Sequence, residues 1–241
     1  MKVAEKIKKK IAKMADGDTF TYQDMPILPA EYSAAAKAME RLIKAGIINR
    51  ASTGIFYKPK NTVFGNLKPN EEELLKLYLF EDNKRIAYIT GTALYNKMGL
   101  TTQVPKNIKV ASRDKRIVTT IGNIKVNPVK SYTDVNNGNY SLLELLDILK
   151  DFKIIPDTDK SQTIRFVLKK IKQLSGKEME LFIKIALKYP PRVRAFAGAL
   201  LNELKPKEPL FELKKSINPL STYDLGISKK ELKNIEYWNI N

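Results

Sequence analysis

The stretch from residue 18 to residue 60 changes from helical to strand-like spacing, and it constrains the fold more than any other part of the chain. Gly46 suits the left-handed position just past a helix end. Before it, after the break at Leu28-Pro29, apolar residues recur at helical spacing: Ala35, Ala38, Met39, Leu42 and Ile43. After it, two runs of β-branched and aromatic residues, 47–50 and 55–58, flank the turn Ser52-Thr53-Gly54. The pattern predicts a short helix-turn-helix followed by a two-stranded wing.

The helix face opposite the apolar stripe carries side chains that a core does not need: Tyr32, Ser33, Lys37, Arg41 and Lys44. The small residues Ala34 to Ala36 keep this helix slim enough to enter a DNA major groove, which is about 12 Å wide. We expect Tyr32, Ser33 and Lys37 to reach base edges and Arg41 to meet phosphate. On the wing, we expect Arg50, Ser52 and Thr53 to contact the neighbouring groove or the backbone. A plain α+β domain without DNA fits the same pattern, and Tyr32 fits packing against the wing equally well.

The charge balance favours a polyanionic partner. Lys and Arg total 43 against 26 acidic residues, there is no His, and the formal charge is +17. This excess runs along the whole chain, so it does not map a binding face. In the basic run from Lys2 to Lys13, an apolar stripe indicates a helix with a mostly solvated lysine face, from which one or two lysines reach phosphates.

The residue types that are missing exclude several kinds of chemistry. The chain has no Cys and no His, which removes disulfides, thiol chemistry, the usual zinc and copper ligands and the commonest general base. We therefore expect no metal site, no cofactor and no enzymatic activity. No run of 18 apolar residues exists and the N-terminus lacks the apolar region of a secretory signal, so the expected location is the cytoplasm, without membrane contact.

The organisation predicted from the sequence is α+β and predominantly helical. Residues 1–60 form the winged helix-turn-helix, and the polar segment 61–70 is a linker. Residues 71–241 form the body, which divides into a small α+β unit over 71–137, a helical bundle over 138–205 and a mixed tail over 206–241. In the α+β unit, Thr90 is expected to cap a short helix, and a second hairpin turns at Ile121-Gly122. In the bundle, Ser175 with Glu178 is a capping box, and Pro191 suits the first position of the last helix.

Five stretches of the chain are distinctive: GDTFTYQD, AMERLIKAGIINRASTGIFYKP, ITGTALYNKMGLTTQVPKNIKVAS, PPRVRAFAGALLNEL and the ending STYDLGISKKELKNIEYWNIN. Together they resemble the AbiEi antitoxin family of type IV toxin-antitoxin systems. The resemblance implies a bacterial antitoxin whose winged helix binds double-stranded DNA repeats in its own promoter and represses transcription. It also implies that residues 71–241 are the antitoxin domain. The functional partner would be a nucleotidyltransferase toxin. The antitoxin would oppose the effect of this toxin, and a stable complex between the two proteins would not be required.

The segment from Gly99 to Pro105 is the most specific part of that resemblance. We consider Thr102 and Gln103 as possible partner contacts, although a helix end at Gly99 and a strand entry at Pro105 also account for the segment. A regulator with a ligand-sensing or dimerising helical domain and no toxin is the alternative function.

A nuclease is the hypothesis of another class. Pro156-Asp157 with Glu203-Leu204-Lys205 resembles a nuclease metal motif, but nuclease chemistry needs the two acids on adjacent strands. Gly91-Thr92-Ala93-Leu94 lacks the ending of a phosphate-binding loop.

Overall fold

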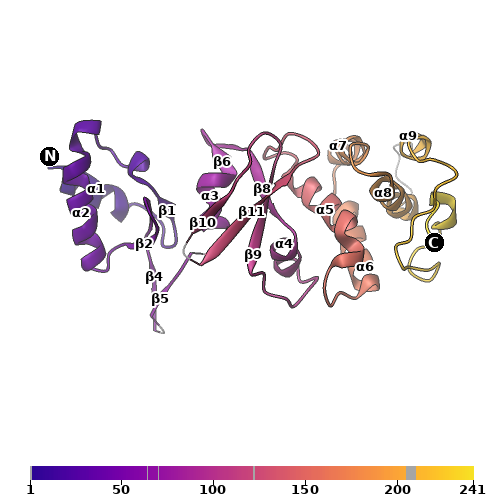
Figure 1. Cartoon of the computed structure of the whole chain (residues 1–241), viewed down its shortest axis with the longest axis horizontal. Coiled ribbons are helices and arrows are strands. Elements are labelled where there is room, and N and C mark those ends of the chain that lie inside the picture. The colour runs from indigo at the N-terminus through magenta and orange to yellow at the C-terminus, as the bar shows by residue number, and fades with distance from the viewer. Residues whose placement is uncertain (1, 64, 70, 122, 205–209) are drawn as a thin grey trace. The chain divides into compact units, whose positions relative to one another are not determined.

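The computed structural model describes residues 2–63, 65–69, 71–121, 123–204 and 210–241. The chain forms two compact units (Figure 1). The first unit comprises Met1–Leu79 together with Thr119–Lys125, and the second comprises Phe80–Val118 together with Val126–Asn241. Both units combine helices with small sheets, so the predicted α+β class is confirmed.

The first unit begins with helices and short strands that alternate along the chain. They are α1 (Val3–Ala12), β1 (Thr19–Phe20), the 3-10 turns Tyr22–Asp24 and Pro29–Glu31, α2 (Tyr32–Lys44), β2 (Asn49–Ser52) and β3 (Ile55–Tyr57). The three strands form an antiparallel sheet in the order β1-β3-β2, with Phe20 opposite Phe56 and Asn49 opposite Tyr57. Helices α1 and α2 pack against each other (Figure 1).

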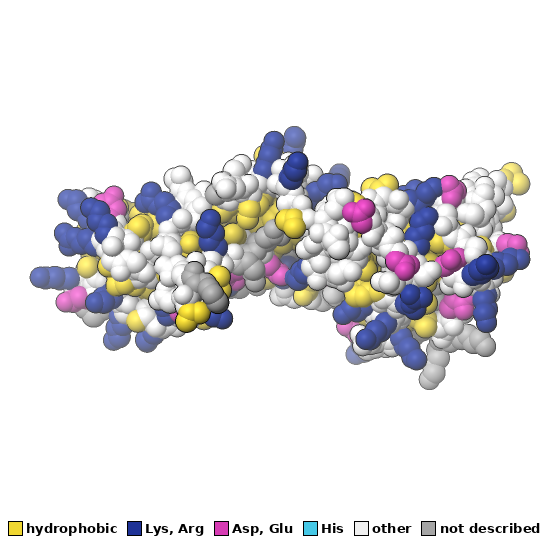
Figure 2. Space-filling view, turned by 90° about the horizontal axis from the view of Figure 1, so that it is seen from below, with side chains coloured by type: hydrophobic (Ala, Val, Ile, Leu, Met, Phe, Trp, Pro, Cys, Tyr) yellow, Lys and Arg dark blue, Asp and Glu magenta, His cyan; other side chains and the backbone are white. Residues whose placement is uncertain are grey.

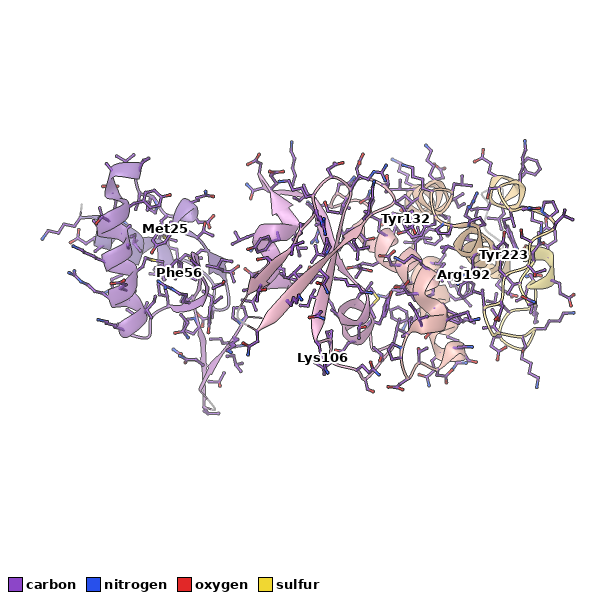
Figure 3. The ribbon with its side chains drawn as sticks, in the orientation of Figure 1. Met25, Phe56, Lys106, Tyr132, Arg192 and Tyr223 are labelled. Carbon is purple, nitrogen blue, oxygen red and sulfur yellow. The ribbon has the colours of Figure 1, made fainter. Side chains whose placement is uncertain are left out.

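The core of this unit follows from the predicted apolar stripes. Ile7 and Ile11 of α1 are buried, as are the predicted α2 residues Ala35, Ala38, Met39 and Leu42. Met25 and Phe56 complete this core, and both are labelled in Figure 3. Helix α2 ends as expected, because Gly46 has a φ of 70° and its N–H donates to the Ile43 carbonyl at 2.9 Å. The next N–H, of Ile47, donates to the Leu42 carbonyl, which completes a Schellman end.

The first unit continues beyond residue 60. The expected linker 61–70 contains a hairpin of β4 (Lys60–Thr62) and β5 (Gly65–Leu67), whereas Asn70 lies outside the described residues. Helix α3 (Glu71–Leu79) follows and belongs to this unit, as does β10 (Thr119–Ile121). The main-chain N–H of Thr19 donates to the Glu73 carboxylate at 3.0 Å, and the Thr19 hydroxyl donates to the Glu73 carbonyl at 2.8 Å. A contact this distant along the chain has no local sequence signal.

The second unit begins with two small antiparallel elements. A short hairpin pairs β6 (Phe80–Glu81) with β7 (Lys84–Arg85). A larger sheet has the order β10-β11-β9-β8. This unit contains β8 (Ala87–Thr90), β9 (Asn107–Ser112) and, from Val126 onward, β11 (Ile124–Lys130). Gly122, at the predicted turn of the β10–β11 hairpin, lies outside the described residues. Helix α4 (Thr92–Lys97) connects β8 to the segment before β9, and its N-cap is Gly91 rather than the predicted Thr90.

Four helices occupy the region that was predicted to be helical (Figure 1). Ser175 and Glu178 form the predicted capping box, in which the Ser175 hydroxyl accepts from the Glu178 N–H at 3.4 Å and the Glu178 carboxylate accepts from the Ser175 N–H at 2.8 Å. Pro191 begins the last of the four helices, as expected. The four helices are α5 (Tyr140–Asp151), α6 (Lys160–Lys172), α7 (Gly176–Ala186) and α8 (Pro191–Leu204).

The C-terminal segment packs onto α8. It contains α9 (Phe211–Lys215) and a 3-10 turn, Glu236–Trp238, whereas residues 205–209 lie outside the described residues. Trp238 is fully buried, and its indole N–H donates to Asn202 of α8 at 3.4 Å. Within the described ranges, every helix is too short or too polar to cross a lipid bilayer.

Candidate nucleic-acid interface

The solvent-facing side of α2 carries the predicted contacts. Ser33, Lys37 and Arg41 are exposed, and they recur at four-residue spacing on the side opposite the buried stripe. No ion pair occupies Lys37 or Arg41 within the described part of the chain. Glu40 is exposed on the same helix and offsets part of this charge. The face therefore offers two free cations and a hydroxyl to an anionic ligand.

Tyr32, at the start of α2, is both exposed and packed. Its side chain keeps 43% of its exposure, and its ring lies 5.9 Å from the ring of Tyr22. Tyr22 in turn meets Phe56 of β3 edge-on at 5.3 Å. Tyr32 thus rests on Tyr22 rather than on the β2–β3 hairpin itself, and the residue stays exposed.

The hairpin residues Arg50, Ser52 and Thr53 have different surroundings. Arg50 is exposed, and its guanidinium lies 5.5 Å from the centre of the Phe56 ring, which restrains the side chain without neutralising it. The Ser52 hydroxyl donates to the Thr120 carbonyl at 3.5 Å, so this side chain turns toward β10. Thr53 is exposed at the tip. Arg50 and Thr53 are therefore the hairpin side chains that are free to contact a ligand.

Helix α1 adds a second basic surface to the first unit. Lys6 is engaged by Glu31 at 3.2 Å, whereas exposed lysines beyond it lack ion pairs within the described residues: Lys8, Lys9, Lys10 and Lys13. The pKa of Glu31 is lowered, first by the Leu28 N–H that it accepts and then by Lys6. In Figure 2, Lys and Arg side chains gather over the surface of this unit, with few acidic side chains between them.

Lys68 was not among the predicted contacts because it fell in the expected linker. It is exposed, and with Arg50 it lines a cavity of about 170 Å³ within the first unit, whose apolar part comes from Tyr57, Leu74 and Ile121. A lysine before a proline in a polar stretch has no distinguishing pattern, so sequence reasoning had no signal for it.

Thr102 and Gln103 lie in the second unit. Thr102 is exposed and lines a cavity of about 390 Å³ together with Thr158 and Gln162. The Gln103 side-chain amide donates to the Asp157 carboxylate at 3.2 Å, and its main-chain N–H donates to the Thr101 hydroxyl at 3.1 Å. Thr101 is buried and holds the segment in place, so Thr102 and Gln103 are presented at the surface.

The two acids of the nuclease alternative are already engaged elsewhere. Asp157 accepts from Gln103, whereas Glu203 on α8 accepts from the Lys233 N–H at 2.8 Å. Lys205, the third residue of that motif, lies outside the described residues. Across the ranges that the structure describes, no group of three acidic side chains is arranged to hold a metal ion.

Comparison with known proteins gives a family and a fold. A family of unknown function (DUF6088) matches residues 6–174, which include parts of both units. The crystal structure of the Rv2827c protein from Mycobacterium tuberculosis aligns with a TM-score of 0.53 at 12% identity, over 91% of this chain and 83% of that one. At this identity the likeness concerns the fold alone. No match to a curated protein was found.

Proposed function

The chain belongs to a family of unknown function, DUF6088, and we propose that it binds duplex promoter DNA through a winged helix and that it also acts as an antitoxin. In this proposal, α2 is the recognition helix and the β2–β3 hairpin is the wing. The order α1, β1, α2, β2, β3 and the sheet order β1-β3-β2 support this assignment. The observation that carries it is a set of three cations on that helix and hairpin, Lys37, Arg41 and Arg50, which have no ion pair among the residues that the structure describes.

Each contact in the proposal has a separate role. Ser33 and Lys37, near the front of α2, read base edges, and Tyr32 supports them from its position against Tyr22. Arg41 and Arg50 meet phosphates, where their charge displaces condensed counterions. Ser52 contributes least, because its hydroxyl is directed to Thr120.

DNA binding is tested with the duplex promoter of the protein's own operon, by fluorescence anisotropy over a range of salt concentrations. Lys37→Ala should cost about 1–3 kcal/mol of binding free energy and relax specificity at one base pair. Arg50→Ala should weaken binding to all DNA sequences alike, and it should reduce the slope of log affinity against log salt concentration by about one unit. Lys177→Ala, an exposed position on α7, is the matched control and should bind like the unaltered protein. Unchanged promoter affinity in both Lys37→Ala and Arg50→Ala at moderate salt would refute this docking.

The antitoxin part of the proposal rests on the resemblance of residues in both units to AbiEi antitoxins, and it is tested separately. The full chain is co-expressed with the nucleotidyltransferase encoded beside it, and cell growth is measured. A Lys37→Ala, Arg50→Ala double variant should lose promoter repression but still protect the cells, because the second unit is unaltered. If the unaltered chain binds DNA yet gives no protection, the regulator without a toxin is the correct function.

A further inference from the structure

The second unit contains a basic cavity that the proposed DNA contacts do not use. It lies where β9 and β11 end and has a volume of about 430 Å³. Its basic side chains come from the loop after β9 and from the end of β11, and they are Arg113, Lys115, Arg116 and Lys130. Two apolar residues of β11, Pro128 and Val129, complete the wall. This volume falls within the usual range of small-molecule sites, about 300–1,000 Å³.

Hydrogen bonds hold the rim of this cavity in place. The Ser112 hydroxyl donates to the Ile86 carbonyl at 2.8 Å and accepts from the Lys115 N–H at 3.4 Å. The Ser131 N–H donates to the Ser112 carbonyl at 2.9 Å, and the Arg113 guanidinium donates to the Ser131 carbonyl at 3.3 Å. The loop after β9 is thus tied to the main chain on both sides. A rim fixed in advance loses little conformational entropy when a ligand binds.

The charges around the cavity are only partly satisfied by the protein. Lys115 forms an ion pair with Glu81 at 2.6 Å, and Asp114 is the one acidic residue of the lining. Arg116 and Lys130 are exposed, and neither has an ion pair within the residues that the structure describes. Two free cations beside a concave surface concentrate positive potential there. An arginine also presents a planar fork of donors that matches a phosphate.

We propose that this cavity binds a nucleoside di- or triphosphate. Arg116 and Lys130 hold the phosphates, and the base lies against Pro128 and Val129, both of which are half-buried. Two separate free cations favour a ligand with more than one phosphate, and the apolar wall favours one with a flat apolar part. A hollow of this small volume suits a nucleotide better than a duplex, which needs an extended surface.

Isothermal titration calorimetry on the full chain tests this proposal with ATP, tripolyphosphate and adenosine as probes. ATP should bind more tightly than either tripolyphosphate or adenosine, because only ATP uses both the cations and the apolar wall. Arg116→Gln should weaken ATP binding about tenfold or more, and Lys130→Gln should weaken it several-fold. Arg165→Gln, on an exposed position of α6 in the same unit, is the matched control and should leave ATP binding unchanged. Thermal melting of each variant verifies that it is folded, which we expect because all three side chains are exposed.

Three results would overturn the proposal. The first is absence of ATP binding, and the second is equal affinity for ATP and tripolyphosphate, with Arg116→Gln and Arg165→Gln equally weakened. The third is loss of promoter binding in Arg116→Gln without any ATP binding, which would assign the cavity to a DNA surface. The test is separate from the winged-helix proposal, because the Lys37→Ala, Arg50→Ala variant should bind ATP normally.

Discussion

Gln103 illustrates how far a single residue can be understood from its neighbours in the sequence. Its segment was predicted to be a helix end followed by a strand entry, and Gly99 does end α4 with a φ of 71°. Its bond to Asp157 could not be predicted, because the two residues are 54 positions apart in the chain. The same limit applies to Ser52, whose sequence context predicted a free hairpin hydroxyl but whose partner, Thr120, lies 68 positions away.

Replacing Gln103 separates a structural role from a partner contact. The Gln103–Asp157 bond is exposed, so Gln103→Ala should cost about 1 kcal/mol or less of unfolding free energy. If the side chain contacts a partner, this variant should melt like the unaltered protein but lose protection against the toxin. Gln173→Ala, at an exposed position just after α6, is the control, and this variant should keep both the normal melting temperature and the protection against the toxin. Normal protection by a normally folded Gln103→Ala protein would assign the segment to structure alone.

Asp147 on α5 is a buried carboxylate that sequence patterns did not single out. It is 1% exposed and accepts hydrogen bonds from Thr90 at 2.6 Å, Tyr88 at 2.9 Å and Tyr189 at 3.2 Å, and it pairs with Lys150 at 2.8 Å. Thr90 belongs to this network because its hydroxyl donates to Asp147, and the residue at the N-cap of α4 is Gly91. Burial and then the charge of Asp147 raise the pKa of Tyr88 and of Tyr189.

These tyrosines predict that the second unit loses stability in alkali. Burial and then Asp151 also raise the pKa of Tyr95, so three tyrosines stay protonated in the fold where an unfolded tyrosine would ionise. Their stabilisation is complete below pH 10 and is lost as the pH rises above it, by about 1.4 kcal/mol per pH unit for each tyrosine. Urea unfolding from pH 8 to pH 11, followed by Trp238 fluorescence, measures this slope. Tyr88→Phe should reduce the slope by roughly a third, and a slope unaffected by this substitution would contradict the assignment.

At the scale of helices and strands, the spacing of apolar residues predicted those elements whose position depends on the local sequence. Helices α5 to α8 appear where apolar spacing and caps placed them, and the β2–β3 hairpin surrounds the predicted turn. The β4–β5 hairpin was missed because Lys60 to Leu67 is polar and, where described, largely exposed, so it lacks the alternation of a half-buried strand. Helices and strands that bury one face can therefore be predicted from the pattern of apolar residues, whereas a solvent-exposed hairpin cannot.

Helix α8 depends on one glycine for its packing against the C-terminal segment. A Cβ at Gly198 would lie well inside van der Waals contact with the Trp238 ring. Gly198→Ala should therefore destabilise the second unit by about 1–3 kcal/mol, although alanine favours helices. Thermal melting and the fluorescence of Trp238, the one tryptophan of the chain, measure the effect. Gly176→Ala, at the exposed first position of α7, should be neutral or stabilising. If Gly198→Ala left the melting temperature and the emission maximum unchanged, the C-terminal segment would be able to accommodate the added Cβ, and the prediction would be wrong.

At the scale of the whole molecule, the division into units differs from the expected boundary at residue 60. Helix α3 belongs with the first unit because Glu73 accepts from the Thr19 N–H and because Tyr78 accepts from the Thr119 hydroxyl at 3.1 Å. Polar composition marked 61–70 as a place to divide the chain, but composition does not record tertiary contacts. The candidates on α2 are exposed, as helical periodicity predicts for the face opposite an apolar stripe, and on the hairpin Arg50 and Thr53 are exposed whereas Ser52 is half-buried.

The position of this boundary predicts how fragments behave. A fragment of residues 1–60 lacks Glu73, so the Thr19 N–H and hydroxyl lose the partners that restrain β1. A fragment of residues 1–79 retains them and should melt several degrees higher, since one or two hydrogen bonds to a charged group are worth about 1.5–3 kcal/mol each. Circular dichroism measures both melting curves. Glu73→Ala in the longer fragment should remove much of the difference, whereas equal melting of the two fragments would mean that α3 does not stabilise the first unit.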